Sequence, residues 1–312
     1  MSKASSKEPF PYAYINKKID KIQNAQIPVN SKAVQYGLGC FSGIRGFRDE
    51  ENKKIYLFRP RDHFKRLKES THILGMNFNL NYKKFVEILK ELIQKNKIKE
   101  DIYIRTTVYA ADTGITPRFD NKNDDIAIYI TSLKDYFDPG KGLNTCVSSW
   151  RRFDDDMFST KAKMTGAYAN SALAKTEALR NGFDEPIFLN REGKVCEASG
   201  ANIFGIKNGI VWTPPAGMNI LEGITRNSLI EIIKNEMNLE VREEGFDRSM
   251  LYTFDELFLS GTAAKVAFIA KVDGRKISDG RIGKTTAKIK KLYEKATTGK
   301  LPGYENWRYQ LN

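Results

Sequence analysis

Three glycine-containing segments of the sequence have residue types that could bind an anion or a cofactor. Residues 221–226 (Leu-Glu-Gly-Ile-Thr-Arg) form a glycine turn before an expected helix, whose free N–H groups and dipole, with the Thr225 hydroxyl, could bind a phosphate. Residues 260–264 (Ser-Gly-Thr-Ala-Ala) form a turn of small residues that lets backbone amides approach a ligand. Residues 37–43 lack the GxGxxG spacing and the following helix of a dinucleotide site, which we therefore reject. An ordinary helix start and an ordinary turn remain alternatives for the first two segments.

Other chemistries lack the residues that they need. His63 and His72 are the only two histidines, so a Ser-His-Asp triad or a histidine-rich metal site would have to use one of them. Cys40, Cys146 and Cys196 lie far apart and form no CxxC pair, which argues against a disulfide framework or a zinc ribbon. We therefore expect no metal site.

The charge of the chain suggests a different kind of partner. The 51 Lys and Arg residues exceed the 38 Asp and Glu residues by 13, and such a surplus is typical of proteins that bind nucleic acid or anionic membranes. The basic residues are nevertheless spread from 17–21 to 284–295 without an aromatic-interleaved cluster. A nucleic-acid-binding protein is thus only a remote alternative, and we expect neither a nucleic-acid nor a membrane partner. Because no apolar run has the length of a signal peptide or a membrane helix, we expect a soluble, cytoplasmic protein.

The elements that position these segments follow a mixed α+β pattern, and a hydrophobic content of 41% is enough for a core. Residues 134–144, with a Pro-Gly pair, predict a linker between a smaller N-terminal domain (1–133) and a larger C-terminal domain (145–312). Before the linker we expect strand-like structure over 10–58, helices at 61–73 and 82–96, and strands at 101–110 and 125–133. After it we expect a strand at 144–150, a helix within 165–182, strands at 185–190 and 202–212, a helix at 224–237, strands on both sides of 260–264, and a helix at 284–298.

Several motifs, in this order, resemble those of the fold-type IV pyridoxal-phosphate aminotransferases, and among them the branched-chain amino acid aminotransferases. They are YGLGCFSGIRGF, FRPRDHFKRL, YIRTTVY, KAKMTGAY, FLNREGKVCEASGANIF, NILEGITRNS and ELFLSGTAA. The resemblance covers nearly the whole chain. It implies a two-lobed α/β fold whose larger domain has a β-barrel-like core, with pyridoxal 5′-phosphate bound between the lobes.

The resemblance also implies a role for each matching residue at the cofactor. Lys163 would form the Schiff base with the cofactor aldehyde and then move the proton between the substrate α-carbon and C4′. Without the register of the motif, Lys161 would be an equal candidate. Glu197 would pair with the pyridine nitrogen, so that the ring accepts electrons, and Tyr168 would bind the phenolic oxygen. The phosphate would be bound by Arg66, whose guanidinium suits phosphate oxygens. The other implied cofactor contacts are Leu221, against the ring face, and Gly223, Ile224, Thr225 and Thr262, at the phosphate.

On the substrate side, the resemblance implies an apolar pocket for a branched side chain. Tyr36, Phe41, Tyr103 and Arg105 would line it, and Arg105 would admit the distal carboxylate of glutamate. Strand alternation places Arg105 on the same face as Tyr103. The α-carboxylate would be held by Tyr103 with the turn Gly261, Thr262 and Ala263. Tyr36 would reach across to a partner subunit, which implies a homodimer or a higher homo-oligomer, and Tyr136 corresponds to a tyrosine of the interdomain loop.

The implied activity is transfer of the amino group between leucine, isoleucine or valine and 2-oxoglutarate by a ping-pong mechanism. A D-amino acid aminotransferase and an aminodeoxychorismate lyase of the same fold remain alternatives. The strand at 103–105 favours the L-specific, branched-chain activity because it supplies both aromatic residues and an arginine. Two departures lie close to the expected pocket and bear on substrate preference: Ser42 replaces a common acidic residue, and KMTGAY replaces a more glycine-rich run.

Overall fold

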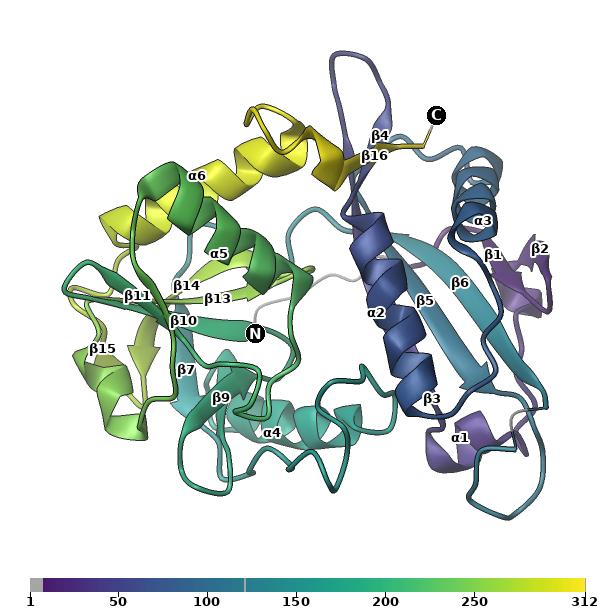
Figure 1. The fold of residues 1–312 in the computed structure, drawn as a ribbon, viewed down its shortest axis with the longest axis horizontal. Helices are drawn as coiled ribbons and strands as arrows, with labels where there is room; N and C mark the ends of the chain where they lie inside the picture. The colour runs from purple at the N-terminus through teal and green to yellow at the C-terminus, as the bar shows by residue number, and fades with distance from the viewer. Residues whose placement is uncertain (1–7, 121, 312) are drawn as a thin grey trace. The chain divides into compact units, whose positions relative to one another are not determined.

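A computed structural model describes residues 8–120 and 122–311, which form two compact units (Figure 1). The N-terminal unit contains residues 8–134, Ala162–Gly166 and 296–311, and the C-terminal unit contains Asp135–Lys161 and Ala167–Lys295. The short segment Ala162–Gly166 thus belongs to the unit that is built mainly from the first half of the chain, although both of its flanking segments belong to the other. The domain limits expected from the sequence remain a prediction.

The centre of the N-terminal unit is an antiparallel sheet with the strand order β16-β4-β3-β5-β6-β1-β2. Its two long central strands are β3 (Gly39–Arg48) and β5 (Ile102–Ala110), in which Gly43 lies opposite Arg105. Successive side chains point to opposite faces, so Phe41 and Arg105 lie on one face and Ile44 on the other. The remaining strands are β1 (Tyr12–Ile15), β2 (Lys18–Lys21), β4 (Ile55–Phe58), β6 (Asp124–Ser132) and β16 (Arg308–Gln310).

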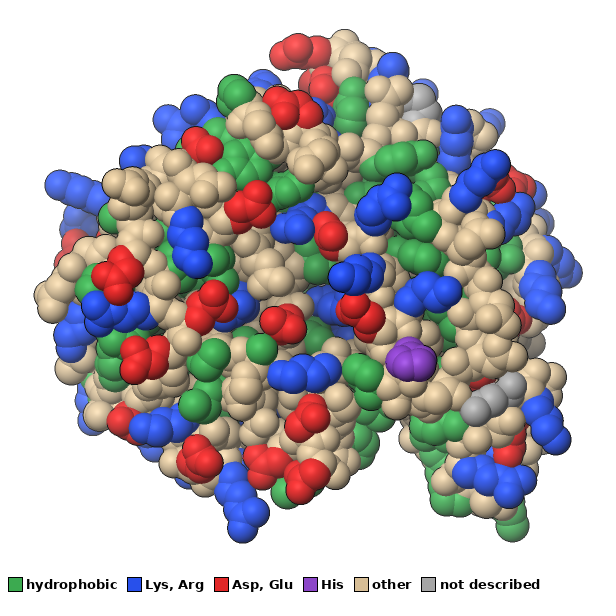
Figure 2. Space-filling view, in the orientation of Figure 1, with side chains coloured by type: hydrophobic (Ala, Val, Ile, Leu, Met, Phe, Trp, Pro, Cys, Tyr) green, Lys and Arg blue, Asp and Glu red, His purple; other side chains and the backbone are tan. Residues whose placement is uncertain are grey.

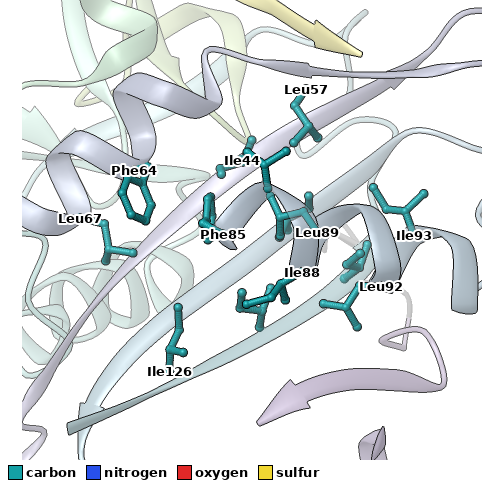
Figure 3. Packing of buried hydrophobic residues seen from close by; sticks show 14 of the residues in the cluster. Ile44, Leu57, Phe64, Leu67, Phe85, Ile88, Leu89, Leu92, Ile93 and Ile126 are labelled. Atoms are coloured by element: carbon teal, nitrogen blue, oxygen red, sulfur yellow. The ribbon is translucent and has the colours of Figure 1, made fainter. Parts of the chain in front are cut away.

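Two amphipathic helices pack on the Ile44 face of this sheet. They are α2 (Pro60–Ile73) and α3 (Tyr82–Lys95), which confirms both helices predicted from the apolar spacing. Phe64 of α2 and Leu89 of α3 are buried in one core cluster with Ile44 (Figure 3). These two helices do not cover the opposite face of the sheet, which carries Phe41 and Arg105.

A short helix interrupts the region that the sequence predicts to be strand-like. The expectation for residues 10–58 is wrong at α1 (Lys32–Tyr36). Ser31 caps this helix, since its Oγ accepts the Val34 N–H at 3.3 Å, and Gly37 ends it with a φ of 67°. Two 3₁₀ turns, Ile22–Asn24 and Glu305–Trp307, complete the unit.

The C-terminal unit is built on a closed barrel. Its strands follow the order β10-β13-β14-β7-β8-β9, and β9 pairs with β10 again, which closes the ring. This closure confirms the barrel-like core and the mixed α/β fold expected from the resemblance. The strands are β7 (Leu143–Val147), β8 (Glu185–Leu189), β9 (Val195–Ala198), β10 (Asn202–Lys207), β13 (Glu256–Gly261) and β14 (Lys265–Val272), with β11 (Ile210–Thr213), β12 (Val241–Glu243) and β15 (Arg275–Lys276) added at the edges.

The helices after residue 144 agree with the sequence expectations. They are α4 (Tyr168–Arg180), α5 (Ile224–Met237) and α6 (Lys284–Thr298), and a 3₁₀ helix spans Arg248–Thr253. The expected strand at 144–150 is shorter, because β7 ends at Val147. Within the described residues, none of the helices has both the length and the apolar character needed to cross a membrane.

Positive and negative side chains are mixed on the surface of the molecule. Figure 2 shows Lys and Arg side chains interspersed with Asp and Glu on the visible face. Ion pairs among the described residues include Lys194–Asp247 at 2.8 Å and Arg248–Asp273 at 2.8 Å. The surplus of 13 positive charges therefore does not form one continuous basic stripe on the face shown.

Candidate active site

In the N-terminal unit, the segment Ala162–Gly166 lies along the start of β3. The Phe41 N–H donates to the Lys163 carbonyl at 2.9 Å, and the Thr165 N–H donates to the Gly39 carbonyl at 2.9 Å. Gly37 allows this close approach, because a Cβ atom there would lie 3.0 Å from Cα of Gly166. The main chain at Lys163 is thus fixed against the sheet.

The structure distinguishes Lys163 from Lys161, which residue type alone made equal candidates for the reactive lysine. Lys163 is half-buried, and its Nζ lies 4.9 Å from the centroid of the Phe41 ring. Lys161 is exposed, belongs to the C-terminal unit, and donates to the carbonyl of Ala216. Since desolvation favours the neutral amine that a nucleophilic lysine needs, the surroundings of Lys163 are the better suited to covalent chemistry.

A buried polar face of α2 lies next to Lys163. His63, Arg66 and Ser70 are three and four residues apart, so they share one side of the helix. His63 is 1% exposed, and its Nδ1 lies 3.2 Å from Oγ of Ser42 on β3. Burial, followed by the positive charges of Arg66, Lys163 and Arg59, lowers the pKa of His63 well below 6.5. The imidazole is therefore neutral at pH 7, close to the two cations that are expected to contact the cofactor.

The other face of the sheet brings the expected substrate residues together. The Arg105 guanidinium carbon lies 4.3 Å from the Phe41 ring centroid, and Arg105 Nη2 donates to Tyr103 Oη at 3.4 Å. The shared face predicted from strand alternation is therefore present. Gly43 leaves room for the Tyr103 side chain, because a Cβ atom at position 43 would lie 1.8 Å from Tyr103 Oη. The result is an aromatic surface beside the Arg105 guanidinium, suited to an apolar side chain or a carboxylate.

The two other expected tyrosines lie in different surroundings. Tyr36 ends α1, and its hydroxyl donates to the carbonyl of Ile115 rather than to the Phe41 surface. Ile115 is 86% exposed. Tyr136 belongs to the C-terminal unit, where its ring packs edge-on against Phe137 at 4.8 Å between centroids.

In the C-terminal unit, Glu197 lies where β9 meets β10 and closes the barrel. Its Oε1 lies 2.8 Å from Nη2 of Arg152, and both side chains are less than 10% exposed. Its Oε2 accepts the Asn202 Nδ2 at 3.1 Å and the Leu221 N–H at 3.2 Å. Arg152 thus supplies the opposite charge that a buried carboxylate requires, and a carboxylate retains further acceptor sites for a ligand N–H.

Asn202 also links Glu197 to the turn before α5. Its Nδ2 donates to the Leu221 carbonyl at 2.9 Å. A Cβ atom at Gly223 would lie 2.1 Å from Asn202 Oδ1, so a larger residue would displace the amide. Close packing of the Asn202 side chain against the turn therefore requires a glycine at position 223. The backbone conformation does not require it, because the Gly223 φ of −72° suits any residue.

The start of α5 has the features of an anion site. Gly223 occupies the N-cap without a side-chain cap, and the first turn contains no acidic residue. Ile224 and Thr225 are buried in that turn, where N–H groups and the helix dipole favour a negative ligand. Three more expected residues, Gly261, Thr262 and Ala263, lie half-buried at the turn between β13 and β14. Tyr168 begins α4 and is half-buried.

The structure adds residues that the sequence analysis did not select. Arg152 and Asn202 hold Glu197, and Ser70 contacts Lys163. Asn202 had a usable signal, because it is a polar residue at the start of an otherwise apolar strand in a motif already noted. Ser70 had a weaker one, four residues after Arg66 on the same helix. Nothing in the sequence around Arg152 indicates its partner, 45 residues later.

Known proteins resemble this chain in sequence and in fold. Residues 39–272 match the family model described as amino-transferase class IV. The chain is 43% identical over 296 residues to a probable branched-chain-amino-acid aminotransferase of Aquifex aeolicus, covering 95% of both chains. It resembles the solved structure of a branched-chain aminotransferase from Thermoproteus uzoniensis with norvaline (35% identity, TM-score 0.91, 97% of this chain and 100% of the other). It also resembles the branched-chain amino acid aminotransferase of T.th. complexed with N-(5′-phosphopyridoxyl)-L-glutamate (32% identity, TM-score 0.91, 98% and 100%).

Proposed function

Because the chain belongs to the class IV aminotransferases, we propose that this aminotransferase moves the amino group between branched-chain L-amino acids and 2-oxoglutarate, with pyridoxal 5′-phosphate as its cofactor. The observation that carries the proposal is the 43% identity to a probable branched-chain enzyme over 95% of both chains. The ligand of the T.th. structure, a phosphopyridoxyl-glutamate conjugate, supports both the cofactor and a five-carbon dicarboxylate substrate.

The described residues fit such a cofactor chemically. The start of α5, which has no side-chain cap and no acidic residue in its first turn, suits a phosphate. We propose that Gly223, Ile224, Thr225, Thr262 and Arg66 bind that phosphate. Pyridoxal phosphate supplies an aldehyde and an electron-accepting ring when bound. Leu221 would pack against the ring, and Tyr168 would bind the phenolic oxygen.

Lys163 and Glu197 have the central chemical roles in this proposal. Lys163 would supply the amine for the cofactor aldehyde and would later take up and return the proton of the substrate α-carbon. Its half-buried position removes the amine partly from water, which favours the neutral, reactive form. Glu197, kept negative by Arg152, would hold a proton on the pyridine nitrogen. The two half-reactions then use the same residues in opposite directions, as a ping-pong mechanism requires.

The surface of Phe41, Tyr103 and Arg105 would bind the substrate side chain. The aromatic rings suit leucine, isoleucine or valine, and the Arg105 guanidinium suits the distal carboxylate of glutamate. Gly261, Thr262 and Ala263 would hold the α-carboxylate. We further propose a homodimer in which Tyr36 lies near the partner's site; size-exclusion chromatography with light scattering tests this.

A direct test combines the absorption spectrum with assays of three amino donors. We expect the purified protein to be yellow and to transaminate leucine and glutamate but not D-alanine. Lys163→Ala should lower the rate at least about a thousandfold, whereas Lys161→Ala, the matched control, should change it by less than about twofold. A colourless protein that takes up no pyridoxal phosphate would refute the cofactor. Preference for D-alanine would point instead to a D-amino acid aminotransferase of the same fold.

A further inference from the structure

One buried hydroxyl joins the helix of Arg66 to the main chain of Lys163. Ser70 lies on α2 and is 0% exposed. Its Oγ donates to the Arg66 carbonyl at 2.8 Å and accepts the Lys163 N–H at 3.1 Å. The donation to the carbonyl four residues earlier orients the hydroxyl, and its lone pairs are then available to the Lys163 N–H.

This contact completes a clamp on Lys163. The Lys163 carbonyl already accepts the Phe41 N–H from β3 at 2.9 Å. Lys163 is therefore held through its carbonyl by the sheet and through its N–H by the helix. The helix that supplies this second contact also carries Arg66, one turn before Ser70.

We propose that Ser70 is a positioning residue, which fixes the main chain of Lys163 relative to the turn of α2 that carries Arg66. In this way the main chains that carry the lysine amine and the arginine guanidinium keep a constant separation during the reaction. Ser70 acts through Lys163 and does not itself touch the reacting atoms. This inference rests on the proposed function, because it assumes that both residues serve one cofactor.

Thr71 provides a matched control on the same helix. It is 3% exposed, and its Oγ1 donates to the Lys68 carbonyl at 2.8 Å, so it too is a buried hydroxyl bound to its own helix. Its hydrogen bond does not extend to Lys163. If a buried hydroxyl on α2 serves only the stability of the helix, then Ser70→Ala and Thr71→Val should have the same consequences.

The first measurement does not depend on catalysis. Hydrogen–deuterium exchange, followed by mass spectrometry on the full chain, reports protection of the Lys163 amide. We expect Ser70→Ala to speed exchange of that amide about five- to tenfold, as loss of one hydrogen bond implies. Thr71→Val should leave it unchanged. Equal protection of Lys163 in wild type and Ser70→Ala would overturn the proposal.

The second measurement addresses the role in the reaction. We expect Ser70→Ala to lower kcat about ten- to a hundredfold, as small misplacements of a catalytic group do, with little change in KM for leucine. Borohydride trapping of the cofactor on Lys163, located by peptide mass, should be slower in the same variant. A kcat equal to that of wild type, or an equal loss in Thr71→Val, would overturn the positioning role. Absence of trapping in the wild-type protein would instead refute the proposed function itself.

Discussion

The two units support their expected site residues in different ways. In the N-terminal unit, Lys163 is held through its main chain, between β3 and Ser70 of α2, while its side chain lies against the Phe41 ring. In the C-terminal unit, Glu197 is held through its side chain, by Arg152, Asn202 and a backbone N–H. The residue that we propose to form and break a bond is fixed through its main chain, whereas the residue that we propose only to carry charge is fixed at its charged atoms.

This contrast predicts that stability and activity separate in one unit and not in the other. Glu197→Ala should lower both the rate and the free energy of unfolding, the latter by about 3–5 kcal/mol, because Arg152 is left buried and unpaired. Lys163→Ala should abolish activity but change the unfolding free energy by less than about 1 kcal/mol. Urea denaturation of both variants checks this.

The double variant Arg152→Met with Glu197→Ala sharpens this first prediction. Removing both charges should restore part of the stability lost in Glu197→Ala, because no unpaired charge remains. Additive losses from the two substitutions would show that the pair is not what stabilises this part of the barrel.

A smaller effect is expected at the turn that links Glu197 to α5. Gly223→Ala places a Cβ atom 2.1 Å from Asn202 Oδ1, so the amide must move away from Glu197 and Leu221. We expect a loss of about 1–3 kcal/mol in stability and weaker uptake of pyridoxal phosphate in a spectroscopic titration. Gly217→Ala is the control, because nothing lies within 4 Å of a Cβ atom there. Equal behaviour of the two variants would contradict the argument.

The smallest effect concerns the neutral imidazole in the N-terminal unit. The pKa of His63 lies well below 6.5 in the folded chain, and an unfolded histidine has a pKa near 6.5. Below pH 6.5 the unfolded state therefore binds the extra proton, and stability falls by up to about 1.4 kcal/mol per pH unit until the folded pKa is reached. His63→Gln should remove this dependence, which urea titrations between pH 7 and 5 would detect. His72→Gln, at an exposed position of the same helix, should retain it; an unchanged slope in His63→Gln would refute the prediction.

Local patterns in the sequence predicted the parts of the fold that depend on neighbouring residues. The apolar spacing of α2 and α3 predicted both helices, because one buried face repeats every three or four residues. Strand alternation placed Tyr103 and Arg105 on one face. The short helix α1 escaped detection, since it has only five residues and depends on its cap at Ser31.

Contacts between distant segments could not be predicted in this way. The pairing of Arg152 with Glu197 joins residues 45 positions apart, and Ser70 and Lys163 are 93 positions apart. The C-terminal strand β16 pairs with β4, some 250 residues earlier in the chain. Because β16 has only three residues, its sequence shows no clear strand pattern. Such contacts depend on how distant segments of the chain come together, and the local periodicity of the sequence does not predict this.

The sequence by itself determined the residue types, their order and the local elements, and with them the resemblance to one enzyme family. Tertiary structure alone decided which lysine lies half-buried beside Phe41, which cation neutralises Glu197, and which hydroxyl reaches the Lys163 main chain. The physical reason is that helix and strand patterns arise from neighbouring residues, whereas burial and charge pairing arise only when distant segments exclude water together.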